Sequence, residues 1–400
     1  MMIFNKLKNT DAIWLPKIPE HWELVKVRHL FKESTKKGFP NETLLVASQE
    51  HGVVSKDTYG KRTVEATKDF HNLKLVEKGD FVISLRSFQG GIELAHERGI
   101  ISPAYTILKE TTQIDKRYFK NLFKSSPFIS LMTLCVKGIR EGQNIDYPTF
   151  KNEYLPLPPI DEQNTIAEYL DKQNSKIDKL VRNKERLIKV LEEKIYFLVN
   201  DDKNWIQDKA KWIFEEVNIK NQNNEELLAV TQDKGVIPKS MCEENFVSPN
   251  SFDGLKLVEE NDFVISLRSF QGGIEISNYR GIVSPAYNVI RLKEEFSNEI
   301  YLAFYKYFFK SPKLISLLNT VISGIRDGQN INWKDFKNLN LPIPNEKSIR
   351  EMLVDFKAFE ELKRTFSKEK IKIKEYREAL ITDLVTGKWR VSQVEKILQP

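Results

Sequence analysis

Two copies of the hexapeptide Arg-Ser-Phe-Gln-Gly-Gly carry side chains suited to contacting nucleic-acid bases. They occupy residues 86–91 and 268–273. An arginine guanidinium bridges O6 and N7 of guanine, and a glutamine amide bridges N6 and N7 of adenine. Paired glycines let the backbone approach a phosphate. The hexapeptides therefore predict DNA contacts from Arg86, Ser87, Gln89, Arg268, Ser269 and Gln271.

The same hexapeptides also fit a purely structural role. Arg86 could pair with Glu93, and Arg268 with Glu275, while the glycines form a turn and the phenylalanine packs inside. A loop that contacts bases identically in both copies would require two binding sites that share those bases. The sequence leaves the two interpretations open.

A second polar loop also occurs twice, at residues 138–145 and 324–331. It is hinged by glycines and rich in amides, so contact with phosphates or bases is physically reasonable. A structural role is an equal alternative. The candidate residues are Arg140, Gln143, Asn144, Arg326, Gln329 and Asn330.

Two corresponding segments differ strongly while their surroundings stay nearly constant. Residues 54–72 include Lys56, Lys61 and Arg62, and residues 237–254 include Lys239. Different base preferences on a common scaffold would produce this pattern, and we interpret the segments as determinants of specificity. Neutral drift of two surface loops is the alternative.

The hexapeptides belong to a longer internal repeat. Residues 73–93 match residues 255–275 at 19 of 21 positions. The blocks 41–53, 98–105 and 138–145 recur, in whole or in part, at 224–236, 280–287 and 324–331. A repeat this long is typical of duplicated domains. The chain therefore presents two similar surfaces, as expected of a protein whose partner itself has two sites.

Each copy is predicted to mix short strands with helices. Strands are expected at 43–48, 81–85 and 100–107, and at 263–267 and 286–292 in the second copy. Helices rich in aromatic residues are expected at 116–134 and 299–318.

Two proline clusters occupy residues 155–159 and 341–344. A long amphipathic helix is predicted after each of them. Asp161 and Asn345 are the expected N-caps, and Gly387 is expected to end the second helix. Each helix should span roughly 50–60 Å. If the two helices pair, the chain order makes them antiparallel. The alternative is that each packs only on its own domain.

Composition limits the classes of function. The net charge of +6 permits a polyanionic partner. Two cysteines at non-equivalent positions, Cys135 and Cys242, argue against a disulfide framework or a cysteine-based zinc site and favour the cytoplasm. No apolar run approaches the roughly 18 residues of a membrane span, and no secretion signal is recognisable.

The sequence contains no recognisable catalytic motif. The chain has no G-x-x-x-x-G-K-[ST] loop for nucleotide phosphates and no Asn-Pro-Pro-Tyr or Asp-Pro-Pro-Tyr motif to hold an extruded adenine. The chain has five histidines: His21, His29, His51, His71 and His96. None of them has a counterpart in the second copy, which disfavours a duplicated metal or catalytic site and leaves only a single-copy histidine site possible. We therefore expect a protein without catalytic activity, bound cofactor or metal.

Several motifs together resemble the specificity (S) subunits of type I restriction–modification systems. The opening segment 14–22, Trp-Leu-Pro-Lys-Ile-Pro-Glu-His-Trp, resembles the opening signature of that family. Residues 155–163, ending in Asp161-Glu162-Gln163, resemble the start of its spacer helix, and residues 384–388 resemble its closing motif. The blocks with Phe88-Gln89-Gly90-Gly91 and Ser102-Pro103-Ala104-Tyr105 resemble framework segments of its target recognition domains. The second half departs from the pattern, because residues 344–347 lack the Glu-Gln pair.

The resemblance implies an α+β chain with two duplicated α/β target recognition domains, joined by two long antiparallel coiled-coil helices with pseudo-two-fold symmetry. The expected boundaries are 1–158 and 204–344 for the recognition domains, 159–203 and 345–390 for the spacer helices, and 391–400 for a tail.

The implied partners are double-stranded DNA, two methyltransferase subunits and restriction/translocase subunits. Those subunits would carry S-adenosylmethionine, ATP and Mg²⁺, and each recognition domain would read half of a bipartite target. Because the two copies are so similar, the half-sites should be nearly inverted repeats. A coiled-coil scaffold with duplicated protein-binding modules is the alternative function.

Overall fold

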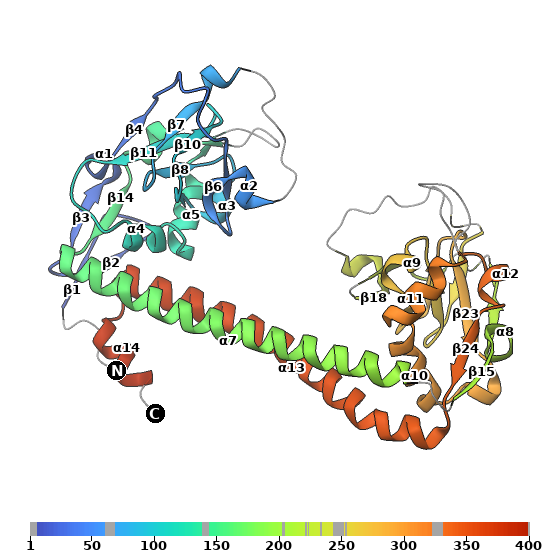
Figure 1. Cartoon of the computed structure of the whole chain (residues 1–400). Coiled ribbons are helices and arrows are strands. Elements are labelled where there is room, and N and C mark those ends of the chain that lie inside the picture. Colours follow the sequence, from blue (N-terminus) through green and yellow to red (C-terminus); the bar gives the residue numbers. More distant parts are fainter. Residues whose placement is uncertain are drawn as a thin grey trace. The chain divides into compact units, whose positions relative to one another are not determined.

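The protein is seen here in a computed structural model that describes residues 6–60, 69–137, 144–201, 205–220, 222, 224–232, 234–242, 252, 254–321 and 331–398 (Figure 1). It divides into two units. Unit 1 comprises Met1–Val181 and Glu369–Pro400, and unit 2 comprises Arg182–Lys368. Both mix helices with antiparallel strands, so the predicted α+β class is confirmed. Within the described ranges, no helix has the length and apolar character needed to cross a bilayer.

A four-stranded antiparallel sheet forms the centre of unit 1, in the order β4-β11-β8-β9. Its strands are β4 (Phe31–Ser34), β11 (Thr106–Glu110), β8 (Phe81–Ile83) and β9 (Glu93–Leu94). Two-stranded pairs surround it: β1 (Leu7–Asn9) with β2 (Lys17–Pro19), β3 (Glu23–Lys26) with β14 (Tyr154–Leu157), β5 (Leu45–Ser48) with β6 (Gly52–Ser55), β7 (Lys74–Val76) with β10 (Gly99–Ile101), and β12 (Val136–Lys137) with β13 (Asn144–Ile145). The shorter helices are α1 (Val27–Leu30), α2 (Lys56–Tyr59), η1 (Phe70–Asn72), α3 (Ser87–Gly90), α4 (Lys116–Leu122), α5 (Ser126–Leu134) and α6 (Tyr147–Phe150).

Unit 2 has a four-stranded sheet made from the corresponding strands in the same order, β16-β23-β20-β21. These are β16 (Phe214–Val217), β23 (Asn288–Leu292), β20 (Phe263–Ile265) and β21 (Glu275–Ile276). The paired strands are β15 (Ile206–Lys209) with β24 (Asn340–Ile343), β17 (Leu228–Thr231) with β18 (Gly235–Pro238), and β19 (Lys256–Val258) with β22 (Gly281–Val283). The shorter helices of unit 2 are α8 (Ala210–Ile213), η3 (Lys239–Met241), α9 (Ser269–Gly272), η4 (Glu294–Phe296), α10 (Glu299–Phe308), α11 (Pro312–Asn319) and α12 (Trp333–Phe336). Helix α14 (Val391–Leu398) closes the chain in unit 1.

Aromatic side chains fill the core between each sheet and its helices. In unit 1, Phe31 of the sheet packs on Phe119 of α4 at a centroid distance of 5.5 Å, and Phe81 on Phe123 at 5.0 Å. All four are fully buried. Burial of one such side chain contributes about 1.5–3 kcal/mol, and an edge-to-face pair adds about 0.5–1.5 kcal/mol. Unit 2 uses equivalent contacts, for example between Phe263 and Phe309.

The structure corrects three predicted elements, each of which contains a proline. The strand expected at 100–107 is two strands, because Pro103 lies in a turn closed by the Tyr105 N–H, which donates to the Ser102 carbonyl at 3.1 Å. The helices expected at 116–134 and 299–318 are each broken in two. Ser311 is extended before Pro312, as residues before proline prefer. Ser125 is the extended N-cap of α5, and Pro127 lies in the first turn of that helix, where proline is tolerated.

The two long helices are present, as α7 (Ile160–Asn200) and α13 (Glu346–Val385). Asn345 caps α13, since its Oδ1 accepts from Ser348 N–H at 2.9 Å. The expected cap Asp161 was wrong: α7 already begins at Ile160, and the carbonyl of Pro159 accepts from Gln163 N–H at 3.0 Å. Asp161 therefore lies in the first turn, where its charge favours the helix dipole.

The helices pair in an antiparallel sense within each unit. In unit 2, Lys194 of α7 pairs with Asp355 of α13 at 2.7 Å, and Lys184 lies over the Phe366 ring at 6.0 Å. In unit 1, Asp178 forms an ion pair with Arg377. Rising numbers on α7 meet falling numbers on α13, as the sequence predicted for paired helices.

Gly387 ends α13 with a backbone that favours glycine. Its φ is +72°, its N–H donates to the Leu384 carbonyl, and the next N–H donates to Asp383 at 2.9 Å. A Cβ on Gly387 would overlap the Pro19 ring and lie 3.0 Å from Trp22.

Replacing Gly387 by alanine should therefore cost more than the roughly 1–2 kcal/mol of a left-handed backbone alone. Gly38 is a matched control, because its φ is +90° and nothing lies within 4 Å of a Cβ placed there. Thermal unfolding of both variants tests this: equal losses for Gly38→Ala and Gly387→Ala would contradict the packing role.

Candidate nucleic-acid interface

The first hexapeptide forms an exposed turn at the end of a buried strand. Strand β8 leads into α3, and Arg86 and Gln89 are both exposed on this turn. Among the residues that the structure describes, Arg86 makes no ion pair. An exposed arginine and an exposed amide three residues apart are thus available to a ligand.

The second hexapeptide has the same geometry in unit 2. Strand β20 leads into α9, and Arg268 and Gln271 are exposed. The backbone angles at the residue preceding each helix agree closely: φ −111° and ψ 15° at Arg86, and φ −113° and ψ 10° at Arg268. Each unit therefore presents the same pair of side chains on the same backbone.

A lysine fixes the turn of unit 1 from behind. Lys124 donates to the Gly90 carbonyl at 2.8 Å and forms an ion pair with Glu93, which is 3% exposed. The ion pair between Arg86 and Glu93, which the structural interpretation predicted, is wrong, because Glu93 pairs with Lys124. Burial raises the pKa of Glu93, and the Lys124 charge partly offsets the rise. A Cβ on Gly91 (φ +80°) would overlap the Phe123 carbonyl, which explains the second glycine.

Lys310 does the same in unit 2. It donates to the Gly272 carbonyl at 3.1 Å and to the Gln232 carbonyl at 3.2 Å, and it pairs with the buried Glu275. The predicted alternative pair of Arg268 with Glu275 is replaced in the same way. Both turns are thus held rigidly by a lysine–carboxylate pair, and this favours preorganised side chains over mobile ones.

Each surface also includes one glutamine that the sequence analysis did not identify. Gln49, in the β5–β6 turn, is exposed and lies so close to Gly90 that a Cβ there would overlap its side chain. Gln232 occupies the equivalent place against Gly272. The sequence does carry a signal for them, because the two glutamines occupy matching positions of the repeat.

The remaining candidates fall into four groups. Ser87 and Ser269 are 1% exposed, and their Oγ atoms accept from Ser84 N–H (2.8 Å) and Ser266 N–H (2.9 Å), so their hydroxyls serve the turn and we no longer assign them to DNA. Lys56 on α2 and Lys239 on η3 are half-buried at matching positions. Asn144 lies in β13, where it pairs with Lys137. The other candidates lie outside the described residues: Lys61, Arg62, Arg140, Gln143, Arg326, Gln329 and Asn330.

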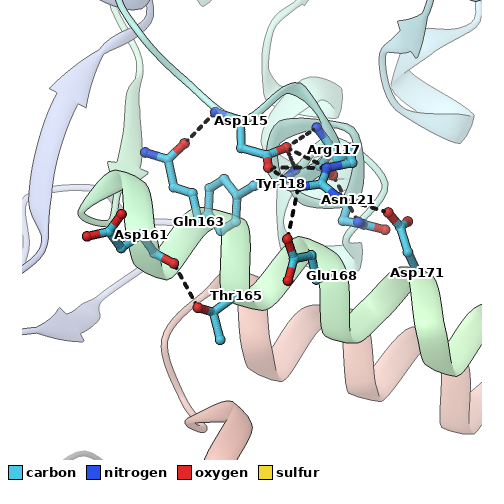
Figure 2. A network of polar contacts seen from close by, with 9 residues as sticks. All are labelled: Asp115, Arg117, Tyr118, Asn121, Asp161, Gln163, Thr165, Glu168 and Asp171. Atoms are coloured by element: carbon cyan, nitrogen blue, oxygen red, sulfur yellow. Dashed lines mark hydrogen bonds and ion pairs between the residues drawn. The ribbon is translucent and has the colours of Figure 1, made fainter.

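The motif at the start of α7 does not belong to this surface. Figure 2 shows Gln163 reaching Asp115 at the start of α4. Gln163 is buried, accepts from Asp115 N–H at 2.9 Å and donates to the Pro158 carbonyl at 2.8 Å. Asp115 in turn caps α4 and pairs with Arg117. This network fastens α7 to α4.

The opening and closing motifs of the chain meet at the same place. Trp22 is fully buried and donates from Nε1 to Glu162 at 2.9 Å. Tyr118 donates to the Val385 carbonyl at 2.8 Å, two residues before Gly387. The motifs at residues 14–22, 155–163 and 384–388, which are far apart in sequence, therefore contact one another in unit 1, where α7 begins and α13 ends.

In unit 2 the long helix α13 is attached to its domain by different contacts. The Glu-Gln pair is missing, and tyrosine hydroxyls make the hydrogen bonds: Tyr301 donates to the Pro344 carbonyl at 3.2 Å and Tyr305 to the Pro342 carbonyl at 2.9 Å. These tyrosine hydrogen bonds therefore replace the contacts of the Glu-Gln pair.

Comparison with known proteins agrees with these observations. Residues 19–193 match the family described as type I restriction modification DNA specificity domain. A Methanocaldococcus jannaschii protein assigned as the type I restriction enzyme MjaX specificity subunit is 21% identical, over 98% of this chain and 99% of its own length.

One of the similar solved structures shows the same fold. A chain from a structure on complex assembly and conformational transition of the type I R-M system aligns with a TM-score of 0.61 at 14% identity, covering 93% of this chain and 99% of the other. The HsdS subunit of Thermoanaerobacter tengcongensis aligns with a TM-score of 0.47 at 15% identity, covering 93% and 98%.

Proposed function

We propose that this chain, which belongs to the family of type I restriction–modification specificity subunits, selects the DNA sequence on which separate partner subunits act. DNA recognition is implied by the family. The observation that carries the proposal further is the exposed arginine–glutamine turn, present once in each unit on the same backbone and held by the same lysine–carboxylate pair.

The target is proposed to be bipartite. Residues 1–158 and 204–344 act as two target recognition domains related by a pseudo-two-fold axis, and each reads one half-site in the major groove. Arg86 and Gln89 contact one half-site, and Arg268 and Gln271 the other. Because these side chains are identical, the half-sites share bases and are nearly inverted repeats.

The unread spacer between the half-sites is proposed to be set by the helices at 159–203 and 345–390. Their antiparallel pairing in each unit supports a rigid strut. Half-sites about one helical turn of DNA apart, on the order of 34 Å, would present both to one face of the duplex.

The helices are also proposed to dock the partner subunits, two methyltransferases and the restriction/translocase subunits. Exposed apolar side chains seven residues apart on α7 support this, because that spacing places them on one face of the helix and exposed apolar patches mark interaction surfaces. Val190 is 52% exposed and Phe197 is 70% exposed. Adenine methylation and ATP-driven cleavage would then belong to the partners, with S-adenosylmethionine, ATP and Mg²⁺ bound there.

Binding of the full-length chain to randomised duplexes tests the proposal. Selection should return a two-part motif with a fixed spacer. Affinity for it should fall roughly 10³- to 10⁵-fold between 50 and 200 mM salt if 6–10 phosphates are contacted. A chain that binds protein partners with little salt dependence and selects no duplex would instead be a scaffold, and the proposal would fail.

A further inference from the structure

We propose that Thr58 with Glu97 in unit 1, and Met241 with Tyr279 in unit 2, read the base pair at which the two half-sites differ. This inference rests on the proposed function and assigns specificity within it. The arginine–glutamine turns are identical, so they contribute the same preference twice. Any difference between the half-sites must come from exposed side chains nearby that differ between the units.

In unit 1 three contacts, joined by short stretches of the chain, lead from the turn to such side chains. Gln49 lies against Gly90, next to Gln89. Two residues further on, the His51 ring meets the Tyr59 ring of α2 at 6.3 Å. On the same helix, the exposed Thr58 donates from Oγ1 to Glu97 at 3.3 Å.

The corresponding place in unit 2 holds different chemistry. Gln232 lies against Gly272 as Gln49 does against Gly90. Met241 aligns with Thr58 and Tyr279 with Glu97 in the repeat. The Tyr279 hydroxyl contacts the Met241 sulfur at 3.9 Å, so the two positions are again partners, and Met241 is 56% exposed.

The backbone at these positions is anchored alike in both units. Arg98, next to Glu97, pairs with Glu42 and Glu77, both closer than 3.0 Å. Arg280, next to Tyr279, pairs with Glu225 and Glu259. The two pairs therefore occupy equivalent places on equivalent scaffolds, and only the side chains offered to a ligand change.

The side chains suggest which bases are read. A carboxylate only accepts hydrogen bonds, and in the major groove it suits the N4 amino group of cytosine. Apolar surface, such as that of Met241 beside the Tyr279 ring, suits the methyl group of thymine. We therefore infer cytosine in the half-site of unit 1 where the half-site of unit 2 has thymine.

Exchanging the pair tests the inference. The full-length variant Thr58→Met with Glu97→Tyr is compared with the wild-type chain in selection from randomised duplexes. Cytosine should change to thymine at one position of one half-site, and affinity for the original duplex should fall about 5- to 150-fold, the usual cost of one mismatched pair. The reverse exchange, Met241→Thr with Tyr279→Glu, should change the other half-site.

Lys32→Glu is the matched control. Like the double variant, it introduces the residue type found at the corresponding position of unit 2, which is Glu215. Lys32, however, lies on β4, at the opposite edge of the sheet from β9. It should leave both half-sites unchanged. If the double variant does not fold, the isosteric Glu97→Gln should still weaken the cytosine preference.

The outcomes separate the two proposals. If the wild-type chain selects no two-part site, the proposed function itself fails. If it selects one, but the half-sites are identical or the exchange leaves the bases unchanged, only the assignment to these pairs is overturned.

Discussion

Replacing Lys124 by methionine should destabilise unit 1 by about 3–5 kcal/mol, the usual result of leaving one partner of a buried ion pair alone. Glu93 would keep its charge in a site where it is 3% exposed, and the Gly90 carbonyl would lose its donor. For a unit of this size the melting temperature should fall by roughly 6–20 °C. Because burial already raises the pKa of Glu93, protonation should relieve the strain, and the loss should shrink as the pH is lowered.

A double variant separates charge from packing. Glu93→Leu with Lys124→Met removes both charges together, and it should recover most of the stability that the single variant loses. Calorimetry of the wild type and both variants measures this. A single variant that melts within 2 °C of the wild type would show that the pair does not hold the turn.

Replacing Arg86 or Arg268 by alanine should weaken binding of the preferred duplex by about 1–3 kcal/mol each, or roughly 5- to 150-fold. The loss should be confined to one half-site, where base preference relaxes. Since the two arginines lie in different units, their effects should add in the double variant. Fluorescence anisotropy with wild-type and single-mismatch duplexes provides the measurement.

Arg28 is the matched control for Arg86. It is an exposed arginine of the same unit, but it lies on α1 and its guanidinium donates to Asn152 at 2.9 Å. Arg28→Ala should leave base preference unchanged. Equal losses from Arg86→Ala and Arg28→Ala would indicate a general effect of positive charge and would remove Arg86 from the list of base contacts.

The repeat made much of the fold predictable. Strands β8 and β20 occur where the matching apolar runs place them, and Asn345 caps α13 as its position after the proline cluster indicates. Local signals of this kind act within a few residues. They failed where a proline changed the backbone, as at Pro103, which divides the expected strand at 100–107.

The site was less predictable because its parts come from distant segments. The sequence places Glu93 seven residues after Arg86, and an ion pair between them was a natural expectation. The fold instead brings Lys124 from the end of α4 to Glu93. Burial was equally hard to predict: Ser87 directly follows the exposed Arg86, yet Ser87 is buried and its Oγ accepts from the Ser84 N–H. The repeat gives one further indication of this contact, because the matching position is a lysine in both copies, Lys124 and Lys310.

The most direct test of the account lengthens both long helices together. Seven residues are inserted after Val181 in α7 and after Lys368 in α13, where the two units meet along the chain. Seven residues add about 10.5 Å and nearly complete two turns, so the faces of the helices stay in phase. Selection from randomised duplexes should then return the same two half-sites with a spacer about 3 base pairs longer. Recovery of the original spacer by a variant that still binds DNA would contradict the claim that the helices set the distance between the half-sites.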